Sequence, residues 1–125
     1  MVEGETGNPE ERPMVASVFY NRLKLGIPLQ CDPTVVYAAI LQNSYQGTIA
    51  QTDLNSNSPY NTYVHSGLPP GPISNPGKAS LLAALHPASS RYLYFVANST
   101  GRHTFSRTLS EHNLAVSLYR RGLPR

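Results

Sequence analysis

The sequence holds a single cysteine, Cys31, so no disulfide can form within the chain. It also has no apolar run long enough to cross a bilayer, although 40% of its 125 residues are hydrophobic. At this length and composition we expect one soluble domain, residues 1–125, with a single core and no membrane contact of its own. Cys31 is expected to be a small buried side chain.

Acidic residues are scarce, seven against ten lysines and arginines, and the formal net charge is +3. The basic residues are scattered, and the single local cluster is Arg120 and Arg121 with Arg125 nearby. Nucleic-acid binding requires a basic stripe or patch, so we predict no nucleic-acid partner.

Features of a cofactor site are also lacking. The two lysines, Lys24 and Lys78, have no phosphate-binding loop beside them, which argues against a pyridoxal phosphate enzyme. Cys31 stands alone, and the histidines have no metal-ligand spacing, so we predict neither a zinc site nor another cofactor. The four histidines are His65, His86, His103 and His112.

A signal peptide is absent from the start of the sequence. Met1 is followed at once by acid and glycine rather than by a basic and then an apolar stretch. We therefore expect the chain to be either cytosolic or a piece of a longer exported or anchored protein.

The sequence does contain a series of helix signals separated by glycine and proline. "MVEGET" is compatible with the last turns of a helix ending at Gly7, and Asn8 with Glu11 resembles a capping box for the next helix. Asp32 followed by Pro33 looks like a helix start with Asp32 as the cap. The predicted helices are the turns up to residue 7, a helix from between residues 9 and 13 to about 24, residues 33–42, residues 77–85, and a last helix from 110.

Apolar residues indicate one β-hairpin and also mark one face of two of these helices. "YLYFVANSTGRHTFS" predicts a β-hairpin that turns at residues 98–101. The predicted fold class is therefore α+β, mainly helical with one small antiparallel sheet. The apolar face of the second helix comprises Met14, Val15, Val18, Phe19, Arg22, Leu23 and Leu25, and that of the last helix Leu114, Ala115, Leu118 and Tyr119.

Two loops separate the central helices. Residues 45–59 are polar, and Thr52 with Asp53 is expected to cap one short turn there. Residues 58–76 carry five prolines and two glycines, which is too stiff for a flexible linker and too polar for a core. A long ordered loop of this kind usually positions side chains.

Two glutamates stand close together at the start of the chain, and only one can face a given cleft. A helix turns about 100° per residue, so Glu3 and Glu5 point about 200° apart. Met1 and Val2 precede Glu5 by four and three positions and share its face. A carboxyl at the edge of an apolar surface has a raised pKa and can act as a general acid, the alternative being a solvated helix residue.

Four segments together resemble the MltG (YceG-like) family of endolytic murein transglycosylases. They are "VEGETG", "VASVFYNRLKLGIPLQCDPTVVYA", "SPYNTYVHSGLPPGPISNPGKASLLAALHP" and "YLYFVANSTGRHTFSRTLSEHN". They occur in the family's order and cover nearly the whole chain. The resemblance implies a lysozyme-like catalytic domain in which Glu5, the second glutamate of an E-x-E-[TA] motif, is the catalytic acid.

The resemblance also implies a reaction and a place. Family members cut the β-1,4 bond between N-acetylmuramic acid and N-acetylglucosamine in peptidoglycan strands without water, which leaves a 1,6-anhydromuramic end. They lie in the cell envelope, on the outer face of the inner membrane, anchored by one membrane helix, with a LysM-like region before this domain. Cell-wall synthesis proteins are expected partners. The membrane helix and the LysM-like region are not found in this sequence, so we expect it to begin inside the catalytic helix.

Three further residues are expected near Glu5. Gln30 and Asp32 flank Cys31 and could hold an acetamido group or a sugar hydroxyl, while Asp32 as a helix cap and Gln30 as a loop anchor are the structural alternatives. Asn21, on the helix predicted to pack beside the catalytic one, could orient Glu5 or hold loop backbone. Arg22 is expected to form a structural ion pair.

"YNTY" supplies aromatic and amide side chains in the proline-stiffened loop. Such groups suit pyranose rings with N-acetyl substituents, although loop tyrosines often pack structurally. With the resemblance, Tyr60 and Asn61 are predicted to contact substrate, and Tyr63 is a further candidate. The competing hypothesis is a non-catalytic peptidoglycan-binding or scaffold module, in which the shortened helix does not present Glu5.

Overall fold

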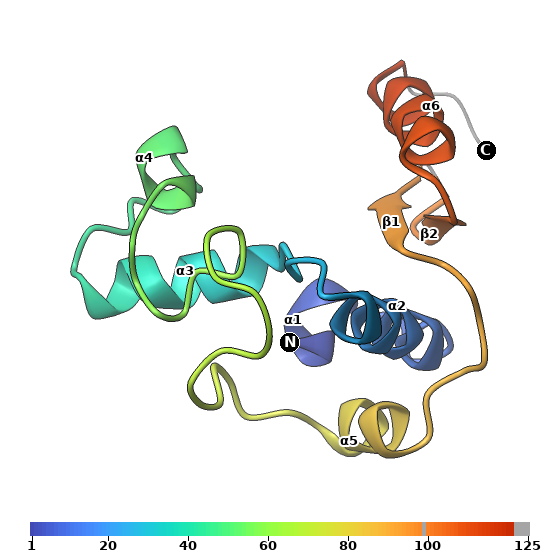
Figure 1. The fold of residues 1–125 in the computed structure, drawn as a ribbon, viewed down its shortest axis with the longest axis horizontal. Coiled ribbons are helices and arrows are strands. Elements are labelled where there is room, and N and C mark those ends of the chain that lie inside the picture. Colours follow the sequence, from blue (N-terminus) through green and yellow to red (C-terminus); the bar gives the residue numbers. More distant parts are fainter. Residues whose placement is uncertain (99, 122–125) are drawn as a thin grey trace.

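The computed structural model describes residues 1–98 and 100–121. Figure 1 shows α3 and α4 at one end of the molecule, the hairpin and α6 at the other, and α1, α2 and α5 between them. This arrangement confirms the predicted α+β class. The elements are α1 Val2–Glu5, α2 Arg12–Leu25, α3 Asp32–Leu41, α4 Gln51–Leu54, α5 Lys78–Leu85, β1 Tyr94–Ala97, β2 His103–Ser106 and α6 Leu109–Arg120.

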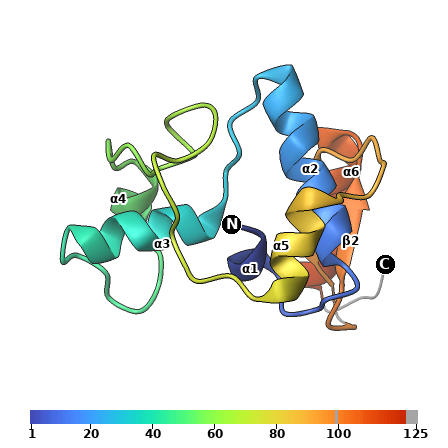
Figure 2. The same cartoon turned by 90° about the horizontal axis from the view of Figure 1, so that it is seen from below.

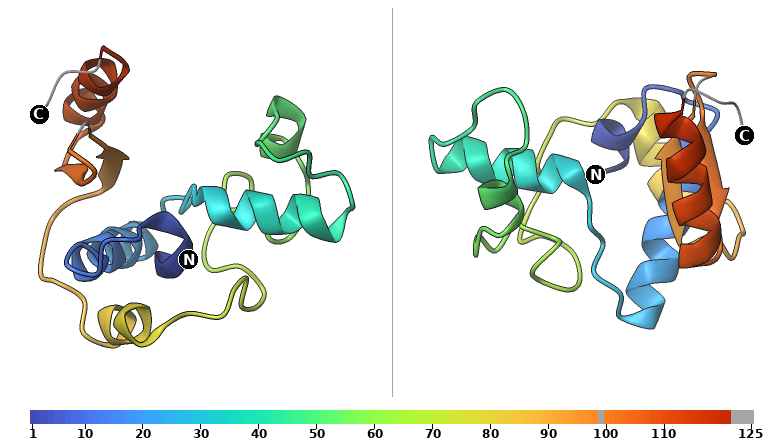
Figure 3. Two further views of the ribbon diagram at one scale, coloured as in Figure 1. Left: turned by 180° about the vertical axis from the view of Figure 1, so that it is seen from behind. Right: turned by 90° about the horizontal axis from the view of Figure 1, so that it is seen from above.

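The short helix α1 lies at the centre of the fold. It contacts α2, α3 and α5, as the view from below in Figure 2 shows. Within the described part of the chain, α3 touches no helix or strand other than α1 and α4. The right-hand view of Figure 3 places α3 and α6 on opposite sides of α1. Helix α1 therefore lies between these two helices.

The hydrophobic core lies between α2, the segment that leads to α3, and the hairpin. Val15, Phe19, Leu29 and Cys31 form its buried centre, which confirms the expected burial of Cys31. The Phe19 ring meets the ring of Phe95 on β1 edge to face, with centroids 6.1 Å apart. Partly buried side chains complete this core: Met1, Val2, Leu23, Phe95 and Phe105. Helix α1 is therefore anchored through the apolar residues that precede Glu5.

The predicted hairpin is confirmed, with Tyr94 opposite Ser106 and Ala97 opposite His103. Ser99 of the predicted turn lies outside the described residues, as does Arg125. Helix α6 packs on both strands but buries only a narrow strip, because a two-stranded sheet offers little width. Its predicted apolar face is therefore wrong in part, since Leu114 and Tyr119 are 51% and 46% exposed while Ala115 is buried.

Three expected helix caps are wrong. Helix α1 ends at Glu5 because Thr6 is extended, so Gly7 does not terminate it. The cap of α2 is Glu11, whose carboxylate accepts hydrogen bonds from the backbone N–H and ring Nδ1 of His103 instead of closing a box with Asn8. The cap of α3 is Cys31, and Asp32 is the first helical residue.

Several local predictions are confirmed. Gly26 ends α2 in the left-handed conformation (φ 70°), which a residue with a side chain adopts only at a cost. Asp53 accepts a hydrogen bond from the backbone N–H of Ala50 and so caps the short helix α4. Helix α5 ends at Leu85, where the predicted helix of residues 77–85 ends. The prediction that Leu25 belongs to the apolar face of α2 is wrong, because this residue at the helix end is 64% exposed.

Glu3 holds α1 against two other helices. Its Oε1 accepts hydrogen bonds from the Gly77 N–H at 2.5 Å and the Ser80 hydroxyl at 3.2 Å, at the start of α5. Its Oε2 pairs with Arg12 Nη2 at 3.0 Å, at the start of α2. The Gly77 N–H contributes most to a lowered pKa of Glu3. Glu3 is therefore a structural anion rather than a proton donor.

The approach of α1 to α3 requires a glycine at position 4. A Cβ there would lie 2.8 and 2.9 Å from Cγ and Cβ of Pro33, distances that real Cβ atoms do not show. Because the proline ring is rigid, Gly4→Ala must push the two helices apart. We expect this substitution to lower the free energy of unfolding by about 1–3 kcal/mol, measured by chemical denaturation.

Gly7→Ala is the matched control for that prediction. A Cβ at position 7 meets nothing within 4 Å, and Gly7 is not in the left-handed region. We therefore expect a change within about 0.5 kcal/mol for this variant. Equal losses in the two variants would show that the contact between Gly4 and Pro33 does not limit stability.

Candidate active site

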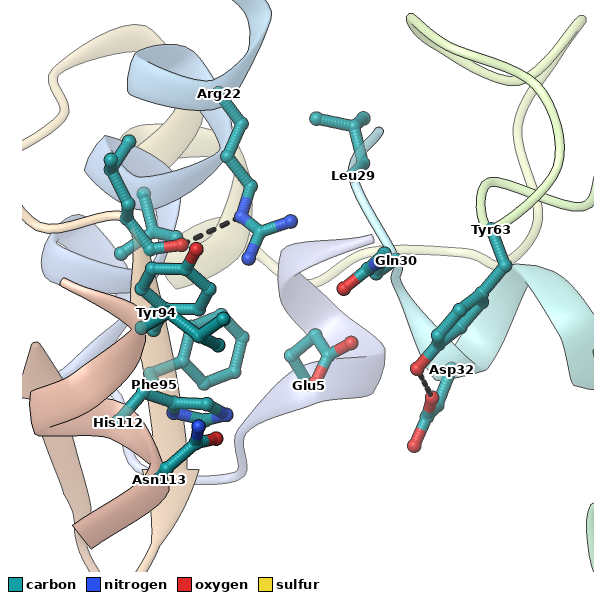
Figure 4. A pocket seen from close by; sticks show the side chains of 13 residues that line it. Glu5, Arg22, Leu29, Gln30, Asp32, Tyr63, Tyr94, Phe95, His112 and Asn113 are labelled. Atoms are coloured by element: carbon teal, nitrogen blue, oxygen red, sulfur yellow. Dashed lines mark hydrogen bonds between the residues drawn. The ribbon is translucent and has the colours of Figure 1, made fainter. Parts of the chain in front are cut away.

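A cleft of about 370 Å³ lies between the α3 end and the α6 end of the molecule, with Glu5 at its base (Figure 4). One wall comes from the start of α3 and the loop that covers it, and the other from α2, β1 and α6. The lining residues are Glu5, Val18, Arg22, Leu29, Gln30, Asp32, Tyr63, Leu93, Tyr94, Phe95, Leu109, His112 and Asn113. The structure thus brings Glu5, Gln30, Asp32 and Tyr63 together.

Glu5 is a half-buried carboxyl at the end of α1. Burial is the main cause of its raised pKa, and the nearby Asp32 carboxylate raises it further. The nearby Cys31 thiol and His103 act in the opposite direction and lower this pKa. Burial also raises the pKa of Cys31, so the thiol stays protonated and available as a donor. The environment of Glu5 therefore favours its protonated form more than water does for a solvated glutamate.

A second cavity of about 490 Å³ is also lined by Glu5. Glu5 and Asp32 line both cavities, so the two hollows meet at these carboxyls, and together they are called the groove. The second part is mainly apolar, which suits the faces of sugar rings. Its other lining residues are Gly4, Pro33, Val36, Tyr37, Ile40, Ile73 and Ser74.

The α3 wall is held by hydrogen bonds to the loop around Thr62. Backbone N–H groups of Gln30 and Cys31 donate to the Thr62 carbonyl and hydroxyl at 3.2 and 2.9 Å. Gln30 has a left-handed backbone (φ 49°), an uncommon conformation for a non-glycine residue that often occurs at functional sites. Its side chain is exposed and lines the cleft.

Asp32 and Tyr63 form a pair on this wall. The Tyr63 hydroxyl donates to Asp32 Oδ1 at 2.5 Å, and burial together with this carboxylate raises the pKa of Tyr63. The tyrosine therefore remains a neutral donor. The predicted cap is wrong because the helical backbone already begins at Asp32, with Cys31 before it as the cap, and the Asp32 side chain turns into the groove.

Asn61 and Tyr60 lie away from the cleft. The side chain of Asn61 has no exposed surface and donates to the carbonyls of Leu54 and Ser56 at 3.0 and 2.8 Å. It has no free group to offer a substrate, because its Oδ1 also accepts from the Tyr63 N–H at 2.9 Å. The Tyr60 ring packs on Tyr37, with centroids 4.9 Å apart, and does not line the cleft.

Asn21 follows one of its two predicted roles. Its amide donates to the backbone carbonyls of Ser90 and Tyr92, both at 2.9 Å, and so holds the segment that enters β1. It neither lines the cleft nor contacts Glu5, so its influence on the site comes through that segment.

The opposite wall contains residues that sequence reasoning missed. Arg22 does not form the expected ion pair with any described residue, and its Nε and Nη1 donate to the carbonyls of Leu93 and Pro28 at 2.6 and 2.7 Å. Its guanidinium lies 4.9 Å from the centroid of the Tyr94 ring, which in turn stacks on His112. Burial lowers the pKa of His112, and the charge of Arg22 lowers it further.

One signal could have identified part of this wall. Leu109, His112 and Asn113 are spaced three and four residues apart on α6, so they share one helical face. The sequence prediction considered only the apolar face of that helix. His112 and Asn113 belong to a second, polar face that looks into the cleft in Figure 4.

Within the described residues, no helix has both the length and the apolar composition needed to span a bilayer. A model of the YceG-like family matches residues 1–118. A crystal structure of a yceG-like protein from Listeria monocytogenes superposes with a TM-score of 0.82 at 52% sequence identity, covering 90% of this chain and 36% of that one.

Two curated relatives carry the name endolytic murein transglycosylase. The protein from Bacillus subtilis is 50% identical over 119 residues, which are 95% of this chain and 32% of that protein. The protein from Streptococcus pneumoniae is 35% identical over 120 residues, which are 94% of this chain and 22% of that protein. The chain thus spans a third or less of the length of these relatives.

Proposed function

The chain belongs to the YceG-like family, and from this premise we propose that it is a peptidoglycan lytic transglycosylase domain with Glu5 as its catalytic acid. The observation that carries the proposal is the position of Glu5. It is a half-buried carboxyl with a raised pKa at the point where two parts of one groove meet. A groove whose two parts meet at the acid suits cleavage within a glycan strand.

The proposed reaction needs one carboxyl. Protonated Glu5 gives its proton to the oxygen of the β-1,4 bond between N-acetylmuramic acid and N-acetylglucosamine, and the bond to the anomeric carbon breaks. Positive charge develops on the muramic ring. The Glu5 carboxylate then accepts the proton of the ring's own 6-hydroxyl as that oxygen attacks the anomeric carbon. A 1,6-anhydro end results, and Glu5 regains its proton.

The other cleft residues have supporting roles in this proposal. Gln30 offers an amide beside Glu5, and Tyr63 orients Asp32 by its hydrogen bond. These groups match the hydroxyl and acetamido substituents of the sugars. Because Glu5 faces the cleft in this chain, the geometry favours catalysis over the alternative of a module that only binds peptidoglycan.

Product analysis tests the proposal directly. Peptidoglycan strands incubated with the chain should yield muropeptides with 1,6-anhydromuramic ends, detected by mass spectrometry. Products heavier by one water, with reducing ends, would overturn the lyase reaction and favour a hydrolase. A hydrolase would need a second carboxylate to activate water. Asp32 could serve, because it is close enough to Glu5 to raise the pKa of that carboxyl.

The same proposal includes a place and partners. The substrate class is the glycan strands of peptidoglycan, which lie outside the cytoplasmic membrane. The chain therefore acts in the cell envelope as part of a longer protein anchored by a membrane-spanning segment, close to cell-wall synthesis proteins. Fractionation of cells that produce the full-length protein would place it in the membrane, and recovery in the cytosol would contradict this part.

The rate of cleavage should depend on the ionisation of Glu5. Only the protonated carboxyl can donate, so kcat/KM, which reports ionisations of the free protein, falls as the pH rises through the pKa of Glu5. Because this pKa lies above the ordinary value of 4.5, the fall should occur at a higher pH than for a solvated glutamate. The measurement is kcat/KM over a pH series with soluble glycan strands.

Asp32→Asn provides the control for the pH profile. The Asp32 carboxylate raises the pKa of Glu5, so its removal should move the alkaline limb toward lower pH, whatever happens to the maximum rate. An alkaline limb that stays in place would show that another group controls the profile.

A further inference from the structure

Arg22 is a buried cation without a carboxylate partner in the described part of the chain. Its side chain is 6% exposed, and the described ion pairs join Arg12 to Glu3, Arg102 to Glu10 and His103 to Glu11. Burial of a charge is costly unless it is paired or hydrogen-bonded. The two carbonyls and the Tyr94 ring offset only part of that cost. Desolvation accordingly lowers the pKa of Arg22.

One edge of the guanidinium remains available to a ligand. Nε and Nη1 are engaged by Leu93 and Pro28, while Nη2 has no protein partner in the described part of the chain. Arg22 lines the cleft, and Figure 4 shows its guanidinium pointing into the space beside Glu5. The planar N–H fork of arginine is well suited to a carboxylate.

The two walls of the cleft differ in charge. Arg22 lies on the α6 side, whereas Asp32 lies on the α3 side with Glu5 between them. A negatively charged substituent is therefore attracted to the wall that holds Arg22 and repelled by the wall that holds Asp32.

We propose that Arg22 binds a carboxylate of the muramoyl substituent and so fixes the direction of the glycan strand in the groove. This inference rests on the proposed function, because it assumes that the ligand is peptidoglycan. Of the two alternating sugars, only muramic acid carries a 3-O-lactyl group. Its carboxylate is free in peptide-free strands, and in peptide-bearing strands the available carboxylates belong to the peptide. Binding at Arg22 places that sugar on the α6 side of Glu5.

Binding measurements with chemically altered strands test the proposed contact with Arg22 without substituting any residue on the Arg22 side of the cleft. The Glu5→Gln chain, which should not cleave, is titrated by calorimetry with peptide-free strands and with the same strands amidated at the lactyl carboxyl. We expect amidation to weaken binding about 10-fold or more, equivalent to about 1.4 kcal/mol. Chitin oligosaccharides of equal length, which lack the lactyl group, should bind like the amidated strands.

A second pair of ligands identifies the source of the carboxylate. Peptide-bearing strands are compared before and after amidation of the peptide carboxyls. A loss of affinity confined to the peptide-free pair assigns the lactyl carboxylate, and a loss confined to the peptide-bearing pair assigns a peptide carboxylate. Equal affinities of acid and amide in both pairs would overturn the proposal.

Arg22→Met tests the residue itself. This variant can lose stability because Arg22 also holds two backbone carbonyls, so the readout is the ratio of acid to amide affinity within one folded protein. The ratio should fall close to one in Arg22→Met and persist in Arg22→Lys. The matched control is Arg91→Met, an exposed arginine outside the cleft, which should leave the ratio unchanged.

If Arg22→Met still bound the acid more tightly than the amide, a residue other than Arg22 would bind the carboxylate, and the proposal would be wrong. The proposed function and this inference can be tested separately. A wild-type chain that binds the acid more tightly than the amide but releases no products would contradict only the catalytic assignment.

Discussion

Glu5→Gln should reduce the rate of glycan cleavage by about 10²–10⁴-fold while leaving strand binding nearly unchanged. Glutamine has the shape of the half-buried Glu5 carboxyl but cannot transfer a proton to the glycosidic oxygen. The rate is measured as new 1,6-anhydro ends per unit time, and binding as the dissociation constant for peptide-free strands. Loss of binding in proportion to the rate would contradict the role of Glu5 as the acid.

The same variant should be at least as stable as the wild type at neutral pH. Burial raises the pKa of Glu5 above its unfolded value, so ionisation of this carboxyl costs folding free energy. That cost is absent below the unfolded pKa, grows as the pH rises through the interval up to the folded pKa, and is complete above it. Glutamine never incurs it, so the two proteins should differ least in acid.

The neighbouring glutamate is the matched control. Glu3→Gln leaves Glu5 in place but removes the charge that pairs with Arg12 and accepts hydrogen bonds from Gly77 and Ser80. We expect Glu3→Gln to lose stability and to keep the chemical step in the molecules that remain folded. A Glu3→Gln protein that is fully stable but inactive would reverse the assignment of the two glutamates.

Asn61→Ala should lower the free energy of unfolding by about 3 kcal/mol, which is a large share of the stability of a small domain. Its fully buried amide donates to the carbonyls of Leu54 and Ser56 and accepts from the N–H of Tyr63. Alanine leaves these backbone groups buried without partners. Denaturant titration measures the loss.

Asn57→Ala tests whether position matters rather than residue type. Asn57 is an exposed asparagine of the same loop, and its substitution should change stability by less than about 0.5 kcal/mol. Unchanged stability in Asn61→Ala, together with a raised KM for glycan strands, would show instead that Asn61 contacts the substrate as the sequence suggested.

Helices and the hairpin were predictable because their signals are local. Gly26 ends α2 where a left-handed residue is needed, and Pro33 marks the first turn of α3. The partly buried position of Glu5 follows from a similar local relation, since a single helical turn places it beside Met1 and Val2, whereas its selection as the acid also used the family resemblance. Each of these local inferences uses only residues within a few positions of one another.

The roles of Asp32, Asn61 and Arg22 depend on contacts with distant parts of the chain. Asp32 looks like a cap from its neighbours, but Tyr63, thirty-one residues away, draws its carboxylate into the groove. The burial of Asn61 depends on how the loop folds back over residues 54–56. Arg22 lines the cleft because Leu93, seventy-one residues away, accepts its hydrogen bond.

The limited contacts of α3 have a consequence for turnover. Because α1 is the only element that joins α3 and α4 to the rest of the described helices and strands, rotation about α1 is a natural hinge motion for this fold. A strand in the groove touches both sides of that hinge. If cleavage of a strand in the groove follows the proposed reaction, each new end contacts one side of the hinge. We therefore expect opening of the hinge rather than proton transfer to limit kcat on long strands.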